Sequence, residues 1–250
     1  MRSRGRSALR PDAGRPADGL GCSVVEEILP AGVCVAERFD DDGPAELFPE
    51  EQAVVAGSTP KRRREFATVR ACARQALGLL GVAPVALLPG KGRAPRWPEG
   101  VVGSMTHCRG YRGAAVARAD ELKSIGIDAE PALPLPRGVL GMIADPAEQA
   151  MLARLAATAP DVCWDRLLFS VKEAVYKAWF PLTERWIRLG EVLARIDADG
   201  AFTARVPVGE RDRHPCRFDG RWLVRDGLLL AAVAVPARED PAVPASDASA

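Results

Sequence analysis

The sequence predicts an α+β fold built from two similar halves. Each half offers one long helix and several short strands, the combination expected when a helix packs on a small sheet. The two long helices are expected over residues 61–80 and 161–179, where large apolar residues recur at helical spacing. A Pro-rich segment, 132–136, separates the two sets of elements. The chain has no short-period repeat, so the pattern indicates a pseudo-duplicated domain and not a repeat array.

The first half is expected to open with two strand segments around a turn at 30–32. A short helix over 49–56 then begins with acidic residues, which are favourable at a helix N-terminus. The long helix that follows stops at Gly81, a natural C-terminal residue. A Gly- and Pro-rich loop, 89–98, comes next. The strands expected in this half cover residues 24–29, 33–37, 101–107, 113–118 and 124–129.

The second half is expected to begin with a helix over 146–157, ahead of its long helix. Its later strands are separated by the pairs Asp199-Gly200 and Asp226-Gly227, which favour tight turns. The strands expected in this half cover residues 193–196, 202–206, 222–224 and 228–235.

These patterns predict a division of the chain into two subdomains, residues 20–131 and 132–236. The segments 1–19 and 237–250 lie outside both and are rich in small residues, Pro and charges. Because such segments bury little apolar surface, we expect both ends to be disordered.

The bulk composition argues against several classes of protein. Of the 250 residues, 48% are hydrophobic and 27% are charged, which is ordinary for a globular protein. The net charge of +1 argues against a general nucleic-acid or membrane-surface binder, which would carry a broad basic excess. No apolar run approaches the roughly 18–20 residues that cross a bilayer, and the N-terminus lacks the apolar core of a signal peptide. We therefore expect a cytoplasmic protein with no membrane and no nucleic-acid partner.

The cysteines and histidines argue against a structural metal or disulfide framework. The six cysteines form no C-x-x-C pair, and the chain has only two histidines, His107 and His214. A zinc site is therefore not expected. We interpret the cysteines as reduced thiols, which is consistent with a cytoplasmic location.

The segment Ser124-Ile-Gly-Ile-Asp-Ala-Glu-Pro131 carries two carboxylates at the end of an apolar strand. Side chains alternate along a strand, so Asp128 and Glu130 point the same way and Ala129 points oppositely. Two carboxylates on one face suit a hard cation such as magnesium. The alternative is a strand that simply leaves the core and meets solvent.

The second charged cluster lies inside the long helix of the second half. Glu173 and Lys177 are four residues apart and share a face, while Lys172 lies about 100° round the helix. The alternative is a surface pair worth a few tenths of a kcal/mol. Large apolar residues flank the cluster on both sides, however, so the helix is expected to be buried. Charges there need partners such as a metal or a phosphate.

Basic and polar residues of the first half form a third group. Arg62 and Arg70 are two turns apart on the long helix and suit phosphate binding, unless they belong to a solvated helix end. His107, beside Thr106, ends a strand, where a histidine can bind phosphate or transfer a proton. The alternative is a half-buried histidine with an ordinary hydrogen bond. The loop 89–98 could let backbone amides approach a ligand, a weak signal.

Five segments occur together in one order: KRRREFATVRACAR, a loop ending in APRWP, VGSMTHCRGYRGAAVA, SIGIDAEP and FSVKEAVYKAWFPLT. With them the chain resembles the 4′-phosphopantetheinyl transferases, and more closely the enterobactin-type and actinobacterial branch of the surfactin-type class. The resemblance implies two α+β halves with pseudo-twofold symmetry, each a long helix packed on a small, mostly antiparallel sheet. Coenzyme A is then expected in the cleft between the halves.

The resemblance also implies roles for individual residues. Metal ligands are expected at Asp128, Glu130 and Glu173, with the backbone carbonyl of Ala129 also facing the metal. The coenzyme A phosphates are expected to meet Arg62, Arg70, Thr106 and His107, with Lys172 and Lys177 near the pyrophosphate, where Asp128 also lies. Some close relatives carry Lys where this chain has Pro89, so Lys91 or Arg93 is expected to substitute there.

The reaction implied by the resemblance moves phosphopantetheine from coenzyme A to a serine of an apo acyl or peptidyl carrier protein and releases 3′,5′-ADP. Magnesium, or manganese, would offset the developing charge, assisted by Asp128 and Lys177. Glu173 would remove the serine proton, either directly or through a metal-bound water. Fatty-acid, polyketide and nonribosomal-peptide carriers, including those of siderophore synthesis, all remain open. Surface candidates for the carrier are Arg109, Arg112 and Arg137, and a monomer is expected.

Two other functions remain as alternatives. One is a non-catalytic coenzyme A-binding module, which would lack an acidic ligand or a lysine; none is missing here. The other is a metal-dependent phosphohydrolase that would use water in place of the carrier serine.

Overall fold

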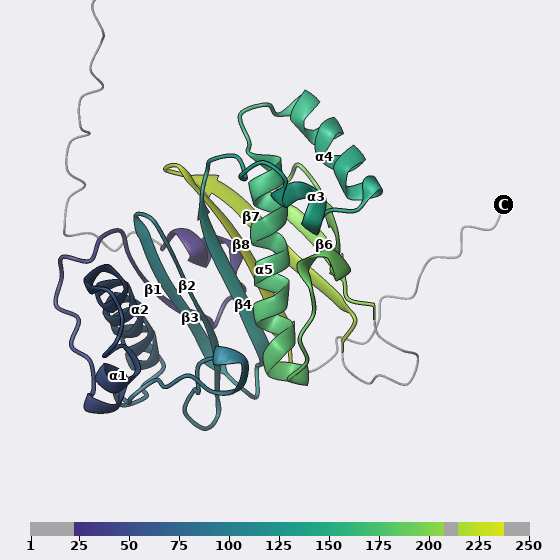
Figure 1. The fold of residues 1–250 in the computed structure, drawn as a ribbon. Helices are drawn as coiled ribbons and strands as arrows, with labels where there is room; N and C mark the ends of the chain where they lie inside the picture. The colour runs from purple at the N-terminus through teal and green to yellow at the C-terminus, as the bar shows by residue number, and fades with distance from the viewer. Residues whose placement is uncertain (1–22, 208–214, 238–250) are drawn as a thin grey trace, which may run out of the picture.

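The computed structural model describes residues 23–207 and 215–237 (Figure 1). The expected disorder of 1–19 and 238–250 lies outside the described residues. The helices are η1 (Val24–Ile28), α1 (Pro49–Val54), α2 (Pro60–Leu79), η2 (Lys91–Arg93), α3 (Val139–Ile143), α4 (Pro146–Thr158), α5 (Trp164–Thr183) and η3 (Leu189–Glu191). The strands are β1 (Cys34–Arg38), β2 (Val101–Cys108), β3 (Tyr111–Arg118), β4 (Leu122–Pro131), β5 (Leu193–Ile196), β6 (Ala201–Arg205), β7 (Arg217–Arg225) and β8 (Leu228–Pro236).

A three-stranded antiparallel sheet, in the order β1-β3-β2, forms the first half, with α2 packed on it (Figure 1). The hydroxyl oxygen of Thr59 starts α2 by accepting a hydrogen bond from the backbone N–H of Arg62 at 3.3 Å. Pro60 follows in the first turn, where its missing N–H costs nothing. Small side chains let α2 approach the sheet closely. The buried core between α2 and this sheet comprises Ala36, Cys72, Ala73, Ala76, Leu77, Leu87, Val101, Ala114 and Val116.

A five-stranded antiparallel sheet, in the order β4-β8-β7-β6-β5, forms the second half, and α5 lies across it (Figure 1). The apolar face of α5 is fully buried, as the sequence pattern predicts. Residues of this core include Leu167, Leu168, Val171, Val175, Trp179, Phe202 and Leu229. The predicted fold class, with a long helix on a mostly antiparallel sheet in each half, is confirmed.

Side-chain hydroxyls join the two halves where β2 and β4 lie next to each other. Ser104 and Thr106 of β2 accept hydrogen bonds from the backbone N–H groups of Ile127 and Ala129, each at 3.1 Å. A further buried cluster spans both sheets and holds them together. Because β4 pairs with β8 but borders β2, it belongs to the joint between the halves. The predicted division after residue 131 stays a prediction.

Gly126 allows α5 to approach β4 closely. A Cβ atom built on Gly126 would lie 1.9 Å from the carbonyl oxygen of Ala174, which is much closer than real contacts allow. The short separation brings the side chains of α5 within reach of the end of β4. A glycine in the motif GIDAEP therefore has a direct packing reason.

Two expectations about local structure were wrong. Residues Val24–Ile28 form the 3₁₀ helix η1 and not part of a strand, and the Glu37 carboxylate accepts hydrogen bonds from the N–H groups of Val24 and Val25 there. Helix α5 continues beyond residue 179 through Pro181, which is tolerated so close to the helix end. The short helix α3 had no sequence signal. Within the described ranges, no helix is long and apolar enough to cross a membrane.

Candidate active site

Asp128 lies at the centre of the candidate site, on β4, with its side chain 7% exposed. Its Oδ1 atom accepts a hydrogen bond from the Lys177 ammonium at 2.7 Å and another from the Thr106 hydroxyl at 3.4 Å. Lys177 also donates to the backbone carbonyl of Ile127 at 3.0 Å. The Oδ2 atom of Asp128 is buried and has no hydrogen-bond partner among the described residues. A buried carboxylate oxygen without a partner is costly, which indicates a place for an additional ligand.

Two further carboxylates lie within electrostatic range of Asp128. Glu173 is one helical turn before Lys177 on α5; burial, and then the charge of Asp128, raise its pKa above the usual value. The pKa of Glu130 is also raised, chiefly by burial and then by Asp128. Each ionised group makes the others harder to ionise, so a bound cation would stabilise all three.

The candidate metal ligands do not all converge on one point. Glu130 forms an ion pair with Arg166, with 2.9 Å between its Oε2 and the arginine Nη1. Among residues 23–207 and 215–237, no three His, Cys, Asp or Glu side chains group closely enough to hold a metal ion. The side chain of Ala129 is buried in the core, on the opposite face of β4, as expected. Metal binding by Asp128, Ala129, Glu130 and Glu173 therefore stays a prediction.

A small basic cavity, of about 190 Å³, collects several of the predicted phosphate-binding residues. Arg62 lies 2.5 Å from the ring nitrogen Nε2 of His107, and burial followed by this neighbouring charge lowers the pKa of His107. Arg70 stacks over the Phe66 ring at 3.5 Å, and burial lowers its pKa to about 10. Two guanidinium groups that line one cavity, one of them largely buried, favour an anionic ligand. The predicted residues that line this cavity are Arg62, Arg70, Arg93, Thr106 and His107.

A second cavity, of about 580 Å³, adjoins the basic one. Arg93, Pro95 and Met105 line both cavities. The second cavity has one mostly apolar wall, made by Trp97, Met105, Tyr176 and Phe180, and it is also bordered by the charged side chains of Lys91, Arg93, Arg96, Lys177 and Glu184. Together the two cavities suit an elongated ligand with an anionic end and a less polar arm.

Lys91 closes the outer side of this second cavity. Its ammonium lies 2.5 Å from the Glu184 carboxylate, just past the end of α5, and both side chains are largely exposed. The short helix η2, which begins at Lys91, packs tightly on α5, because a Cβ atom on Gly92 would lie 2.1 Å from the Phe180 ring. Lys91 therefore lines the second cavity and not the basic one.

The expectation that Lys172 lies near the pyrophosphate is corrected by the structure. Lys172 is fully buried on the opposite side of α5, where its ammonium forms an ion pair with Glu148 at 2.8 Å and donates to the carbonyl of Ile143. The roughly 100° between Lys172 and Glu173 on the helix is the physical reason. The two lysines of the motif therefore have different partners.

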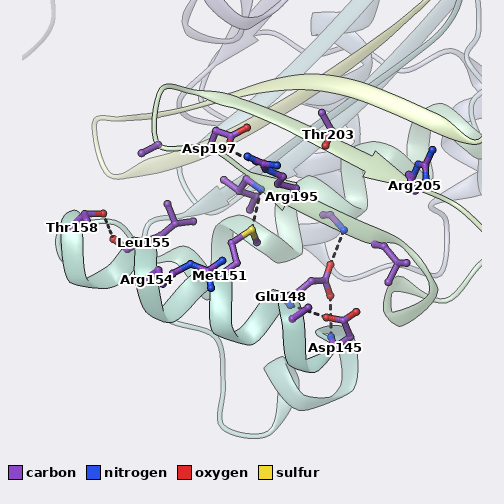
Figure 2. A pocket seen from close by; sticks show the side chains of 15 residues that line it. Asp145, Glu148, Met151, Arg154, Leu155, Thr158, Arg195, Asp197, Thr203 and Arg205 are labelled. Carbon is purple, nitrogen blue, oxygen red and sulfur yellow. Dashed lines mark hydrogen bonds and ion pairs between the residues drawn. The ribbon is translucent and has the colours of Figure 1, made fainter. Parts of the chain in front are cut away.

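Glu148 of this ion pair lines another groove, of about 740 Å³ (Figure 2). Glu148 points from α4 toward β5, where it accepts a hydrogen bond from the backbone N–H of Ala194 at 2.7 Å. Arg195 and Asp197 pair with each other on its rim. None of the predicted site residues lines this groove, and Glu148 is already fully bonded, so its size does not make it the active site.

The expectation that Arg112 lies on the surface, where it could meet a carrier, was wrong. It is buried and held by the Asp41 carboxylate at 2.6 Å and by backbone carbonyls. Arg109 and Arg137 are exposed. The sequence analysis also missed the large side chains that line the second cavity, because in a sequence they cannot be distinguished from residues of the hydrophobic core. These are Trp97, Met105, Tyr176 and Phe180.

Two protein-family models match this chain. Residues 50–117 match the model of the 4′-phosphopantetheinyl transferase N-terminal domain, and residues 124–233 match that of the 4′-phosphopantetheinyl transferase superfamily. The chain therefore belongs to the 4′-phosphopantetheinyl transferase superfamily. Enzymes of this superfamily transfer the phosphopantetheine group of coenzyme A to carrier proteins, and this is the activity of the chain.

Several curated relatives share this assignment. The chain is 53% identical over 221 residues to 4′-phosphopantetheinyl transferase Svp of Streptomyces mobaraensis, covering 86% of this chain and 90% of that protein. It is 45% identical over 223 residues to 4′-phosphopantetheinyl transferase PptT of Mycobacterium tuberculosis, covering 84% and 97%. A more distant relative is enterobactin synthase component D of Salmonella typhimurium, 36% identical over 123 residues, or 48% of this chain and 49% of that protein.

Proposed function

We propose that coenzyme A occupies the two adjoining cavities, with its nucleotide phosphates at the basic cavity and its pantetheine arm along the wall of Trp97, Met105, Tyr176 and Phe180 in the second. The observation that carries this proposal is the meeting of the two cavities beside Thr106 and Lys177, whose polar atoms are 3.4 Å apart. The pyrophosphate joins the two parts of coenzyme A, so it belongs at that meeting point. Arg62, Arg70, Arg93 and His107 would then hold the 3′-phosphate end.

A magnesium ion, or manganese, would be held by Asp128, Glu130 and Glu173, with the Ala129 carbonyl as a further oxygen donor. The unpartnered Oδ2 of Asp128 and the raised pKa values of Glu130 and Glu173 support this set, which consists of the hard oxygen ligands that magnesium prefers. When bound, such an ion supplies positive charge that offsets the charge developing on the phosphates.

The protein's own side chains would do the remaining work. The serine oxygen of the carrier forms a bond to the β-phosphorus of coenzyme A, and the bond from that phosphorus to the bridging oxygen breaks, releasing 3′,5′-ADP. Glu173, one helical turn before Lys177 on α5, would accept the serine proton. Lys177 remains beside the phosphates and compensates the charge of the leaving group.

The carrier is proposed to be an acyl or peptidyl carrier domain of a fatty-acid, polyketide or nonribosomal-peptide synthase. The relative from enterobactin synthesis supports a nonribosomal-peptide or siderophore context. We further propose that the chain acts as a monomer in the cytoplasm, where coenzyme A is available. One chain supplies residues from both halves to the site, so no second copy is needed.

Intact-mass measurement of an apo carrier protein tests the proposal. Incubation with this protein, coenzyme A and magnesium is expected to add one phosphopantetheine, and a chelator should prevent the addition. Asp128→Asn is expected to lose at least about a hundredfold in rate, as when one stabilising group is removed from a site. Asp197→Asn, on the rim of the distant groove, is the matched control and should retain full activity.

Each alternative function predicts a different result in the same assay. A phosphohydrolase would consume coenzyme A without changing the carrier mass. A binding module would leave both coenzyme A and carrier unchanged. Full activity of Asp128→Asn would contradict the central role of this carboxylate.

A further inference from the structure

Arg166 links one candidate metal ligand to the segment that joins the two halves. It lies in the first turn of α5, and its Nη1 pairs with Glu130 Oε2 at 2.9 Å. Its other nitrogens donate to the backbone carbonyls of Leu133 and Pro134, each at 3.0 Å. Each of the three guanidinium nitrogens therefore donates one hydrogen bond, either to one carboxylate or to one short stretch of backbone.

The pairing has a consequence for the acidic cluster. Glu130 lies two residues from Asp128 on the same face of β4, so the two carboxylates repel each other when both are ionised. Arg166 opposes this repulsion by holding the Glu130 carboxylate. Lys177 has the corresponding effect on Asp128, at 2.7 Å, but leaves one of its oxygens without a partner. The protein's own cations thus balance the carboxylates in the arrangement described here.

We infer that Arg166 competes with the divalent cation for Glu130 and thereby sets the metal affinity of the site. In the arrangement described, Glu130 forms an ion pair with Arg166. To act as a metal ligand, Glu130 would have to leave this ion pair. The cation must replace an ion pair whose side chains are only 18% and 20% exposed, so its binding is weaker than the ligands alone would give. Arg166 acts here as a positioning residue. This inference rests on the metal site proposed above.

Direct titration of Mn²⁺, by calorimetry or electron paramagnetic resonance and without coenzyme A, tests the inference. Arg166→Gln is expected to tighten Mn²⁺ binding roughly tenfold, within the range of couplings between contacting side chains. Arg166→Lys, which keeps the charge but loses the fork, should give a smaller gain and serves if the Gln variant does not fold. Arg195→Gln removes another arginine that pairs with a carboxylate and should leave the affinity unchanged.

A double-mutant cycle separates competition for Glu130 from a general effect of charge. In the Glu130→Gln background, Arg166→Gln is expected to have no effect on Mn²⁺ affinity, because the carboxylate over which arginine and metal compete is gone. A gain that persists in that background would overturn the inference. Weaker or unchanged binding in Arg166→Gln alone would also overturn it and would make Arg166 an orienting partner of a bound ligand, or a structural residue.

The metal site itself is tested separately by Asp128→Asn. If that variant binds Mn²⁺ as tightly as the unaltered protein, the proposed site fails and the inference with it. If Asp128→Asn loses binding while Arg166→Gln leaves it unchanged, the site stands and only the role of Arg166 is refuted.

Discussion

Two lysines of α5 form ion pairs of nearly the same length in different surroundings. Lys172 meets Glu148 at 2.8 Å, and Lys177 meets Asp128 at 2.7 Å. In the first pair both side chains are almost fully buried, at 0% and 4% exposure, and both Glu148 oxygens are bonded. In the second pair the lysine is 26% exposed, and Asp128 keeps one oxygen without a partner.

The difference teaches that a functional ion pair is recognised by what it leaves unsatisfied. A pair whose polar atoms are all bonded within the protein has no capacity left for a ligand, so it acts on the fold. A pair that faces a cavity with an unpartnered oxygen keeps capacity for a metal or a phosphate. Distance and residue type alone would not distinguish Lys172 from Lys177.

Replacing Lys172 should give the largest effect on stability. Lys172→Met leaves the buried Glu148 charge without a countercharge, so we expect the unfolding free energy to fall by about 3–5 kcal/mol, as for other broken buried pairs. Urea denaturation measures this change. Lys172→Met/Glu148→Gln removes the stranded charge and should recover part of the loss. A Lys172→Met variant as stable as the unaltered protein would contradict the structural role.

Replacing Lys177 should affect the reaction rate more than the stability. Lys177→Met is expected to lower the rate of carrier modification by about a hundredfold or more, as when one charge-stabilising group is removed. Its stability should change less than that of Lys172→Met, since the lysine is partly exposed and Asp128 retains Thr106 as a partner. Steady-state kinetics and urea denaturation of both variants, measured side by side, check the contrast. Equal losses of stability in the two variants would remove the distinction.

The same comparison shows how far the sequence could lead. Helical and strand periodicity predicted both long helices, most strands and the α+β class, because each depends on local pattern. The sequence also predicted that Glu173 and Lys177 share one face of the helix, because they lie four residues apart. The partner of Lys172 was not, because Glu148 comes from a separate helix and its approach depends on how α4 packs.

Other site features depended on contacts between distant segments. Glu130 and Arg166 are 36 residues apart, and no local pattern joins them. The buried state of Arg112 follows from Asp41, far away in the sequence. The convergence of Arg62, Arg70 and His107 was anticipated only through resemblance to a known family, since spacing alone left a solvated helix end equally open.

The smallest predicted effect concerns His107, whose pKa lies below its usual value of 6.5. Burial and then Arg62 disfavour its charged form, against the weaker opposite effect of Glu65, while Arg112 and Lys177 add to the lowering. The fold thus favours neutral histidine. This contribution to stability is complete above the unfolded pKa and is lost as pH falls below 6.5 through the folded pKa. Without ligand, stability should therefore fall less on acidification in His107→Gln.

A bound phosphate should reverse the preference of His107, because an anion beside the ring stabilises its charged form. Coenzyme A binding would then take up a proton, and affinity should rise as pH falls from 8 to 6.5, by about twofold to threefold for a rise of one pKa unit on binding. Calorimetric titration at several pH values measures this rise, which should be absent in His107→Gln. His214→Gln, which alters the chain's other histidine, should keep it. A pH dependence that survives in His107→Gln would show that the phosphate contacts lie elsewhere and that His107, like Lys172, serves the fold.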